Sequence, residues 1–244
     1  MDLDYTTYRI ICSHPFGISR STHNYYDIVY VYMSDEGYIG RGEAAPSVRY
    51  DESTDQVISQ LESIDSIDKN ISLKEGMQWC KRNANGISSL EAALSTAWLD
   101  LWTLKNKQSI SDFFKSDNNM LYTSFTIAIG DLDLIPMKLE EAQSYQILKI
   151  KLGVSVENDK QIIKLIRNET DKLIRVDANE GWDLDTGKKM CKWLADHNVE
   201  FVEQPFKAQN LRDTAKLRDV SPLPLIADEN SIKSSNIPDI VHAF

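Results

Sequence analysis

The chain has 244 residues, of which 42% are hydrophobic, enough for one large core or for the cores of two ordinary domains. Its formal net charge of −10 argues against a nucleic acid or an anionic membrane as partner, because both require clustered Lys and Arg. Three widely separated cysteines, an acidic N-terminus and the lack of a long apolar run predict a cytoplasmic protein without disulfides or membrane spans.

The first third of the chain alternates β-rich runs with polar turns. Residues 5–12, 27–33 and 38–43 are predicted strands, and the Ser-Asp-Glu-Gly turn at 34–37 indicates that the second and third form a hairpin. Residues 14–24 are polar and predict a loop between the first two strands. Such a loop beside a sheet is a common place for substrate contacts, although most loops are only connections.

Three amphipathic segments then predict helices over residues 53–67, about 72–83, and 88–105. The third has the broadest apolar stripe, made of Leu90, Ala93, Leu94, Ala97, Trp98, Leu101 and Leu104. We interpret this stripe as a surface that packs against a neighbouring domain rather than as a cofactor site. Together, these strands and helices predict an α+β domain.

From residue 121 the pattern changes to strands that alternate with helices. The predicted strands are 122–129, 147–152, 173–178, 200–203 and 223–227, and helices are predicted at 159–167 and 186–196. Such alternation indicates βα units with a parallel sheet, as in a (β/α) barrel or a doubly wound fold. No glycine-rich phosphate loop follows any of the strands, which weakens the dinucleotide-binding alternative.

The strand at 147–152 carries two lysines, Lys149 and Lys151. Strand side chains alternate between faces, so both lysines must project from one face, roughly 6–7 Å apart along the strand. Two crowded ammonium groups on a dry face favour the neutral amine, and a lysine with a lowered pKa can act as a base at neutral pH. The alternative is a solvated edge strand with two surface lysines.

Three later strands each end on an acid: Asp177, Glu203 and Asp228. The spacings of 26 and 25 residues correspond to about one βα unit each, so in a barrel the three carboxylates converge at the C-terminal mouth. Three carboxylates repel one another unless a cation lies between them, and oxygen ligands of this kind suit Mg²⁺. The alternative is that each acid caps the helix after its own strand.

Several short segments resemble a known family. They are Lys-Ile-Lys at 149–151, Val-Asp-Ala-Asn-Glu-Gly-Trp at 176–182, Glu-Gln-Pro at 203–205, Ala-Asp-Glu-Asn at 227–230, and Gly-Arg-Gly-Glu-Ala-Ala-Pro at 40–46. With them the chain resembles the enolase superfamily, in particular its muconate-lactonizing-enzyme-like branch. The resemblance implies an α/β plus α+β fold, with an α+β capping domain over 1–115 and a catalytic enolase-type (β/α) barrel over 116–244.

Within that branch, Thr-Ser-Phe-Thr-Ile at 123–127 is similar to the dipeptide epimerases, isomerases that act on dipeptides such as L-Ala-D/L-Glu. The resemblance implies that Lys151 is one of two acid/base lysines and that Lys149 lowers its pKa. It implies a Mg²⁺ site formed by the acids Asp177, Glu203 and Asp228. The metal would stabilise the enediolate formed when the α-proton of the dipeptide is removed, and this pairing of a lysine base with Mg²⁺ is a known property of the superfamily.

The same resemblance implies substrate contacts. Thr126 would line the substrate pocket, and Asn179 in the 176–182 motif would also contact the substrate. Arg20 would pair with an acidic side chain of the dipeptide, or it is simply a surface arginine. Cycloisomerase and o-succinylbenzoate synthase activities need the same lysine and metal scaffold, so the motifs leave them open, together with an inactive metal-binding remnant.

The chain departs from the family pattern after Asp228. The second acid/base lysine of the family lies on a sixth barrel strand, and Lys233, the nearest lysine, does not match that motif. The acidic pair that holds the ammonium group of the substrate is also missing. We therefore expect a C-terminally truncated chain with an incomplete barrel of about five strands, which cannot close and lacks the two-base route. Such a chain would be poorly soluble or completed by a missing fragment or by a second copy, which leaves a homo-oligomer open.

Overall fold

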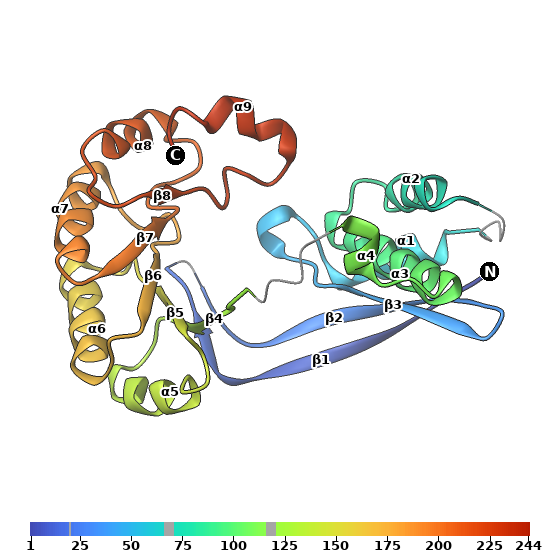
Figure 1. Ribbon diagram of the computed structural model, residues 1–244, viewed down its shortest axis with the longest axis horizontal. Coiled ribbons are helices and arrows are strands. Elements are labelled where there is room, and N and C mark those ends of the chain that lie inside the picture. The colour runs from blue at the N-terminus through green and yellow to red at the C-terminus, as the bar shows by residue number, and fades with distance from the viewer. Residues whose placement is uncertain (20, 66–70, 116–120) are drawn as a thin grey trace. The chain divides into compact units, whose positions relative to one another are not determined.

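In the computed structural model, which describes residues 1–19, 21–65, 71–115 and 121–244, the chain forms two units (Figure 1). The first unit combines Met1–Cys12 with Tyr25–Asn119, and the second combines Ser13–Asn24 with Met120–Phe244. Ser13–Asn24 therefore groups with the second unit, although it lies inside the range 1–115. No helix formed by the described residues is long and apolar enough to cross a bilayer.

An antiparallel sheet with the order β1-β2-β3 belongs largely to the first unit. Its strands are β1 (Asp2–Gly17), β2 (Thr22–Asp35) and β3 (Tyr38–Ala44). The predicted hairpin is confirmed, with Asp35 paired to Tyr38 across the turn. The predicted loop at 14–24 is wrong, because β1 continues to Gly17 and β2 begins at Thr22. Strand pairing satisfies the backbone of a polar segment as well as that of an apolar one, so polarity alone did not indicate a loop.

Helices cover this sheet and form the core of the first unit with it. They are η1 (Val48–Tyr50), α1 (Thr54–Glu62), α2 (Leu73–Asn83), α3 (Ser88–Asn106) and α4 (Ile110–Phe114). Apart from Leu104, which is exposed, the apolar stripe of α3 packs into the core of its own unit, together with Val29, Val31 and Met33 of β2. The interpretation of the stripe as a surface for another domain is therefore wrong. Gly40 and Gly42 of β3 permit the close contact, because a Cβ there would collide with backbone atoms of Ala97 and Ala93.

The second unit contains a five-stranded parallel sheet, as the alternating pattern predicted. Its strands, in the order in which they are bonded, are β4 (Ser124–Ile127), β5 (Ile147–Lys151), β6 (Leu173–Asp177), β7 (Val199–Glu203) and β8 (Leu225–Ile226). Along the described residues β4 and β8 are the two edges of an open sheet, so the incomplete enolase-type (β/α) barrel is confirmed.

Helical segments follow each strand, namely η2 (Leu132–Leu134), α5 (Ile135–Glu141), α6 (Val156–Glu169), α7 (Leu184–Ala195), α8 (Leu211–Arg218), η3 (Ser234–Asn236) and α9 (Ile237–Ile240). Of these, α5, α6, α7 and α8 cover one face of the sheet (Figure 1). Alternate strand residues point into this helical layer and are fully buried, for example Leu148, Ile150, Ile174 and Val176. The residues between them, which include Lys149 and Lys151, lie on the opposite face.

Candidate active site

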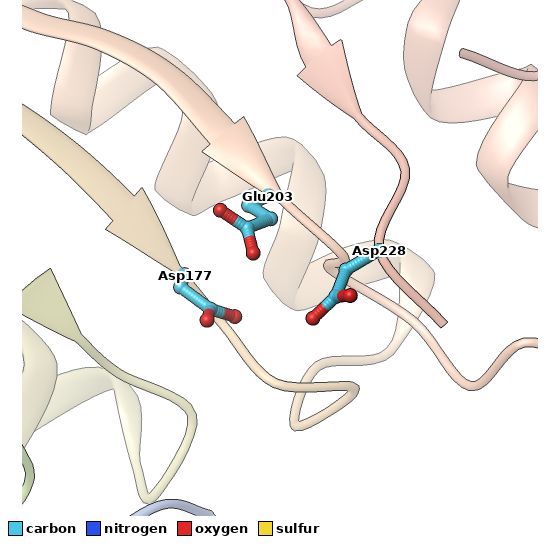
Figure 2. A group of neighbouring side chains, drawn as sticks. All are labelled: Asp177, Glu203 and Asp228. Carbon is cyan, nitrogen blue, oxygen red and sulfur yellow. The ribbon is translucent and has the colours of Figure 1, made fainter. Parts of the chain in front are cut away.

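Three acidic side chains meet at the carboxyl ends of β6, β7 and β8. Asp177 and Glu203 are the last residues of β6 and β7 and are paired in the sheet, and Asp228 follows the end of β8 by two residues. One carboxylate oxygen from each lies within 4.8 Å of the other two (Figure 2). The structure thus brings together the three acids that the sequence pattern predicted to converge at the C-terminal mouth of the barrel. Asp177 is buried, Glu203 is half-buried and Asp228 is exposed.

The two lysines of β5 face these acids. Lys149 Nζ lies 2.7 Å from Glu203 Oε1 and 3.1 Å from Asp177 Oδ2. Lys151 Nζ lies 2.8 Å from Asp177 Oδ2 and 3.1 Å from Asn179 Oδ1. Because Lys151, Asp177 and Glu203 are in register on three successive strands, the sheet itself fixes their order. The alternative of a solvated edge strand is excluded, since β5 is paired on both sides.

The electrostatics of Lys149 differ from the expectation based on crowding. Burial alone would lower the pKa of Lys149, but the carboxylates of Asp177 and Glu203 outweigh burial and raise that pKa above its ordinary value. Crowding by a second amine therefore does not lower the pKa of Lys149, and the acid/base role expected for Lys151 stays a prediction. The two lysines share one face of β5, as their spacing predicts, but the acids that face Lys149 lie on β6 and β7 and have the larger effect on its pKa.

The acids are perturbed in opposite directions. Burial tends to raise the pKa of Asp177, yet the ammonium groups of Lys151 and Lys149 hold it below its usual range. Burial raises the pKa of Glu203, the hydrogen bond from Lys149 opposes that shift, and the negative charge of Asp177 adds to it. Glu203 is thus a carboxylate whose ionisation is disfavoured by burial and by the acid beside it.

This donor set fits a divalent cation. Three carboxylate oxygens within 4.8 Å of one another supply the hard ligands that Mg²⁺ prefers, and they leave room for water or substrate oxygens. The carboxylate of Asp228 receives no hydrogen bond or ion pair from the part of the chain that the structure describes. A cation among the three would relieve the repulsion that contributes to the raised pKa of Glu203.

The residues expected to contact substrate have different outcomes. Thr126 of β4 is half-buried and pairs in register with Lys149, so it lies one strand away on the same face. Asn179 accepts the hydrogen bond from Lys151, and its backbone N–H donates to Asp177 Oδ1 at 2.9 Å. Arg20 lies outside the described residues. The substrate-binding roles of these side chains stay predictions.

The segment Ser13–Asn24 also contributes to the site, more than its polar composition indicated. The ring of Phe16 lies 5.9 Å from Lys151 Nζ, and the hydroxyl of Ser19 donates to the Asn179 carbonyl at 2.7 Å. Gly17 forms an antiparallel bridge with Ile129, two residues after the end of β4. The sequence marked this segment as a place for substrate contacts but did not single out Phe16 or Ser19.

Hydrogen bonds between neighbouring loops fix the strand ends, and the sequence analysis missed them. Asp159 of α6 is buried and accepts from Gly153 N at 3.1 Å, after β5, and from Trp182 Nε1 at 3.0 Å, after β6. Glu180 accepts from Ala208 N at 2.8 Å, which joins the loops after β6 and β7. These side chains share no pattern of spacing that a single sequence would reveal, although Glu180 belongs to the 176–182 motif.

A parallel βα sheet with two lysines and three acids at its carboxyl edge defines a class of barrel-type α/β proteins. Comparison with known proteins narrows this class. The family described as "Enolase C-terminal domain-like" matches residues 137–243. An L-Ala-D/L-amino acid epimerase of Pedosphaera parvula is 34% identical over 229 residues, which cover 89% of this chain and 65% of that protein. A protein of the same name from Flavobacterium johnsoniae is 30% identical over 250 residues, covering 100% of this chain and 73% of that protein.

The fold has a match among solved structures. The dipeptide epimerase of Cytophaga hutchinsonii, complexed with Mg and the dipeptide D-Ala-L-Val, superposes with a TM-score of 0.87 at 22% identity, covering 99% of this chain and 68% of that one. The chain belongs to the enolase superfamily, and its relatives include dipeptide epimerases. It spans 65% of the length of the Pedosphaera epimerase and 73% of the Flavobacterium one.

Proposed function

We propose that the chain forms part of a Mg²⁺-dependent epimerase that removes the α-proton of a dipeptide carboxylate. The observation that carries this proposal is the meeting of two lysine amines with three acids at one sheet edge, with Lys151 held by Asp177 and Asn179. Relatives named as L-Ala-D/L-amino acid epimerases support the reaction, and a structural neighbour complexed with Mg and a dipeptide supports the cofactor and the substrate class.

Each side chain at this sheet edge has its own part in the chemistry. Asp177, Glu203 and Asp228 would hold Mg²⁺, which when bound supplies positive charge to the substrate carboxylate as it becomes an enediolate. Lys151 accepts the α-proton, and its amine is fixed by hydrogen bonds to Asp177 and Asn179. Lys149 bridges Asp177 and Glu203, and so keeps these two acids in one arrangement. Thr126 and Phe16 lie where they would line the substrate pocket.

The direct test is exchange of the substrate α-proton in D₂O. Incubation with Mg²⁺ and L-Ala-L-Glu, or an L-Ala dipeptide with an apolar second residue, should replace the α-proton by deuterium, as followed by proton NMR. Exchange without inversion would show that Lys151 works while no second base acts on the opposite face. Tight Mg²⁺ binding with no exchange of any dipeptide would contradict the proposal and leave the metal-binding remnant, or the cycloisomerase and o-succinylbenzoate synthase classes, as the better assignments.

A further inference from the structure

Gln204 occupies an unusual place beside the metal site. It follows Glu203 directly and is fully buried. Its backbone has a φ of +39°, in the left-handed region that residues with a side chain rarely adopt. Strain of this kind persists only where the surroundings hold the residue in place. For Gln204, two backbone hydrogen bonds, its N–H to Ile226 O at 2.9 Å and its carbonyl from Glu180 N at 2.8 Å, contribute to that hold together with those of its side-chain amide.

Three hydrogen bonds fix the amide of Gln204. Oε1 accepts from the backbone N–H of Asp228 at 2.9 Å, and Nε2 donates to Phe206 O at 2.9 Å and to Asn230 Oδ1 at 2.7 Å. The backbone N–H can only donate and the backbone carbonyl can only accept, so the amide has one permitted orientation. Asn230 is held in turn, because its Nδ2 donates to Ala208 O at 2.8 Å.

The side chain continues a strand ladder that would otherwise stop. The backbone pairing of β7 with β8 covers Val202 with Leu225 and Glu203 with Ile226, and it ends with the bond from Gln204 N to Ile226 O at 2.9 Å. The next ligand-bearing residue, Asp228, lies beyond this ladder. Gln204 Oε1 accepts the Asp228 N–H in the place of a backbone carbonyl.

The position of the Asp228 carboxylate depends on the hydrogen bond to Gln204 more than the positions of the other two carboxylates depend on any one contact. Asp177 and Glu203 end regular strands and have lysines at their carboxylates. The carboxylate of Asp228 has no such partner within the described ranges, so its position follows from its backbone. That backbone is held by Gln204 at the N–H and by Ser231, whose N–H donates to the Asp228 carbonyl at 2.8 Å.

We propose that Gln204 is a positioning residue for the metal centre, holding the backbone of Asp228 so that its carboxylate stays within ligand distance of Asp177 and Glu203. This inference rests on the proposed function only in that the three acids bind a divalent cation. It adds a residue that touches neither metal nor substrate. Side chains that orient metal ligands in this way commonly change metal affinity by about 10- to 100-fold when they are replaced.

The test is the affinity for Mn²⁺, a probe that takes the same oxygen ligands as Mg²⁺, measured by isothermal titration calorimetry on the full chain. Gln204→Met keeps the length of the side chain and removes all three hydrogen bonds. We expect it to raise the Kd for Mn²⁺ about 10- to 100-fold. In an Asp228→Asn background the same replacement should have little further effect, because the ligand that Gln204 positions is already impaired.

A matched control separates positioning from general loss of stability. Thr214 of α8 is buried, and its hydroxyl donates to Asn210 O at 3.1 Å. Thr214→Val removes a buried hydrogen bond within α8 and should lower the unfolding midpoint without changing the Kd. If Gln204→Met does not fold, Asn230→Ala takes its place. This replacement removes the hydrogen bond from Gln204 Nε2 to Asn230 Oδ1 and should raise the Kd for Mn²⁺ about threefold to fivefold.

The outcomes distinguish the two proposals. Wild-type binding of Mn²⁺ with an unchanged Kd in Gln204→Met and Asn230→Ala would overturn the positioning role and leave the metal centre intact. An effect of Gln204→Met that persists in full in the Asp228→Asn background would also overturn it. Absence of Mn²⁺ binding by the wild-type chain would overturn the metal centre itself and the positioning role with it.

Discussion

The two faces of the five-stranded sheet are built by the same strands and behave very differently. On the helix-covered face, Leu148 and Ile150 of β5 are fully buried in an apolar core. One residue away, Lys149 and Lys151 of the same strand face carboxylates on the opposite side. The difference shows that a single alternating strand can supply stability from one face and chemistry from the other.

The polar face carries ion pairs between the lysines of β5 and the acids of β6 and β7. Amines and acids there are desolvated together, and an ion pair of this kind contributes little net stability because desolvation offsets the attraction. The apolar face has no such offset, since burying a large aliphatic side chain contributes about 1.5–3 kcal/mol. Replacements on the polar face should therefore change activity and metal affinity, and replacements on the apolar face should change the free energy of unfolding.

The largest effect is expected for Lys151→Met. This variant removes the group that accepts the α-proton but keeps the length of the side chain, so α-proton exchange in D₂O should slow by about 10²- to 10⁴-fold. The unfolding midpoint should change little by comparison. Lys164→Met is the matched control, because Lys164 is exposed on α6. Equal slowing by both variants would mean that exchange does not pass through Lys151.

On the other face, Ile150→Ala should produce the largest loss of stability. Ile150 is fully buried, and truncation to the β-carbon leaves a cavity that costs about 2–5 kcal/mol of unfolding free energy. Urea unfolding measures the loss. The Kd for Mn²⁺ of the folded variant should stay within about threefold of the wild-type value, since the neighbouring lysines keep their places. A Kd about tenfold weaker would show that the two faces are not independent.

Addition and removal of metal test the polar face as a unit. A cation that binds only the folded chain raises the free energy of unfolding by about 2.7 kcal/mol at 100 times its Kd, and EDTA should reverse the gain. In Asp177→Asn, which removes one ligand charge, the gain at the same concentration should largely vanish. The measurement is the urea midpoint with Mg²⁺ and with EDTA. An identical Mg²⁺ gain in this variant would place the cation elsewhere.

Some of the site could be predicted because its signals are local. The alternation that sends Lys149 and Lys151 to one face is a property of any strand. An acid at the end of each apolar run also shows directly in the sequence. Parallel strands in order then bring Asp177 and Glu203 together without further information.

The rest depended on contacts between distant segments. The sequence shows that one side of α3 is apolar, but it does not show what that side packs against. The structure shows that it packs against β3 of the same unit, where Gly40 and Gly42 allow the close contact. The raised pKa of Lys149 depends on acids that belong to two other strands, β6 and β7. Gln204 shows the same limit, since only the structure reveals that its amide binds Asp228.

The smallest effect concerns a charge on the helix-covered side of the sheet. Lys138 of α5 is only 5% exposed, and its amine donates a long hydrogen bond to Ala128 O at 3.4 Å. Burial lowers the pKa of Lys138 from 10.5, and the charges of Glu141 and Asp131 oppose that shift only in part. The charged amine is therefore unfavourable in the folded state. Lys138→Met should stabilise the chain at pH 7, within the range of about 0.5–2 kcal/mol that is common for stabilising single replacements.

The pH dependence of that gain identifies its cause. Between the lowered pKa of Lys138 in the folded chain and 10.5, the unfolded state binds more protons, so wild-type stability rises with pH across this window. The advantage of Lys138→Met should be complete below the folded pKa and should shrink as the pH approaches 10.5. Urea midpoints at about pH 7 and about pH 10 give the comparison, with Lys164→Met as the exposed control. A gain of equal size at both pH values would mean that packing of the methionine, and not removal of a buried charge, stabilises the apolar side.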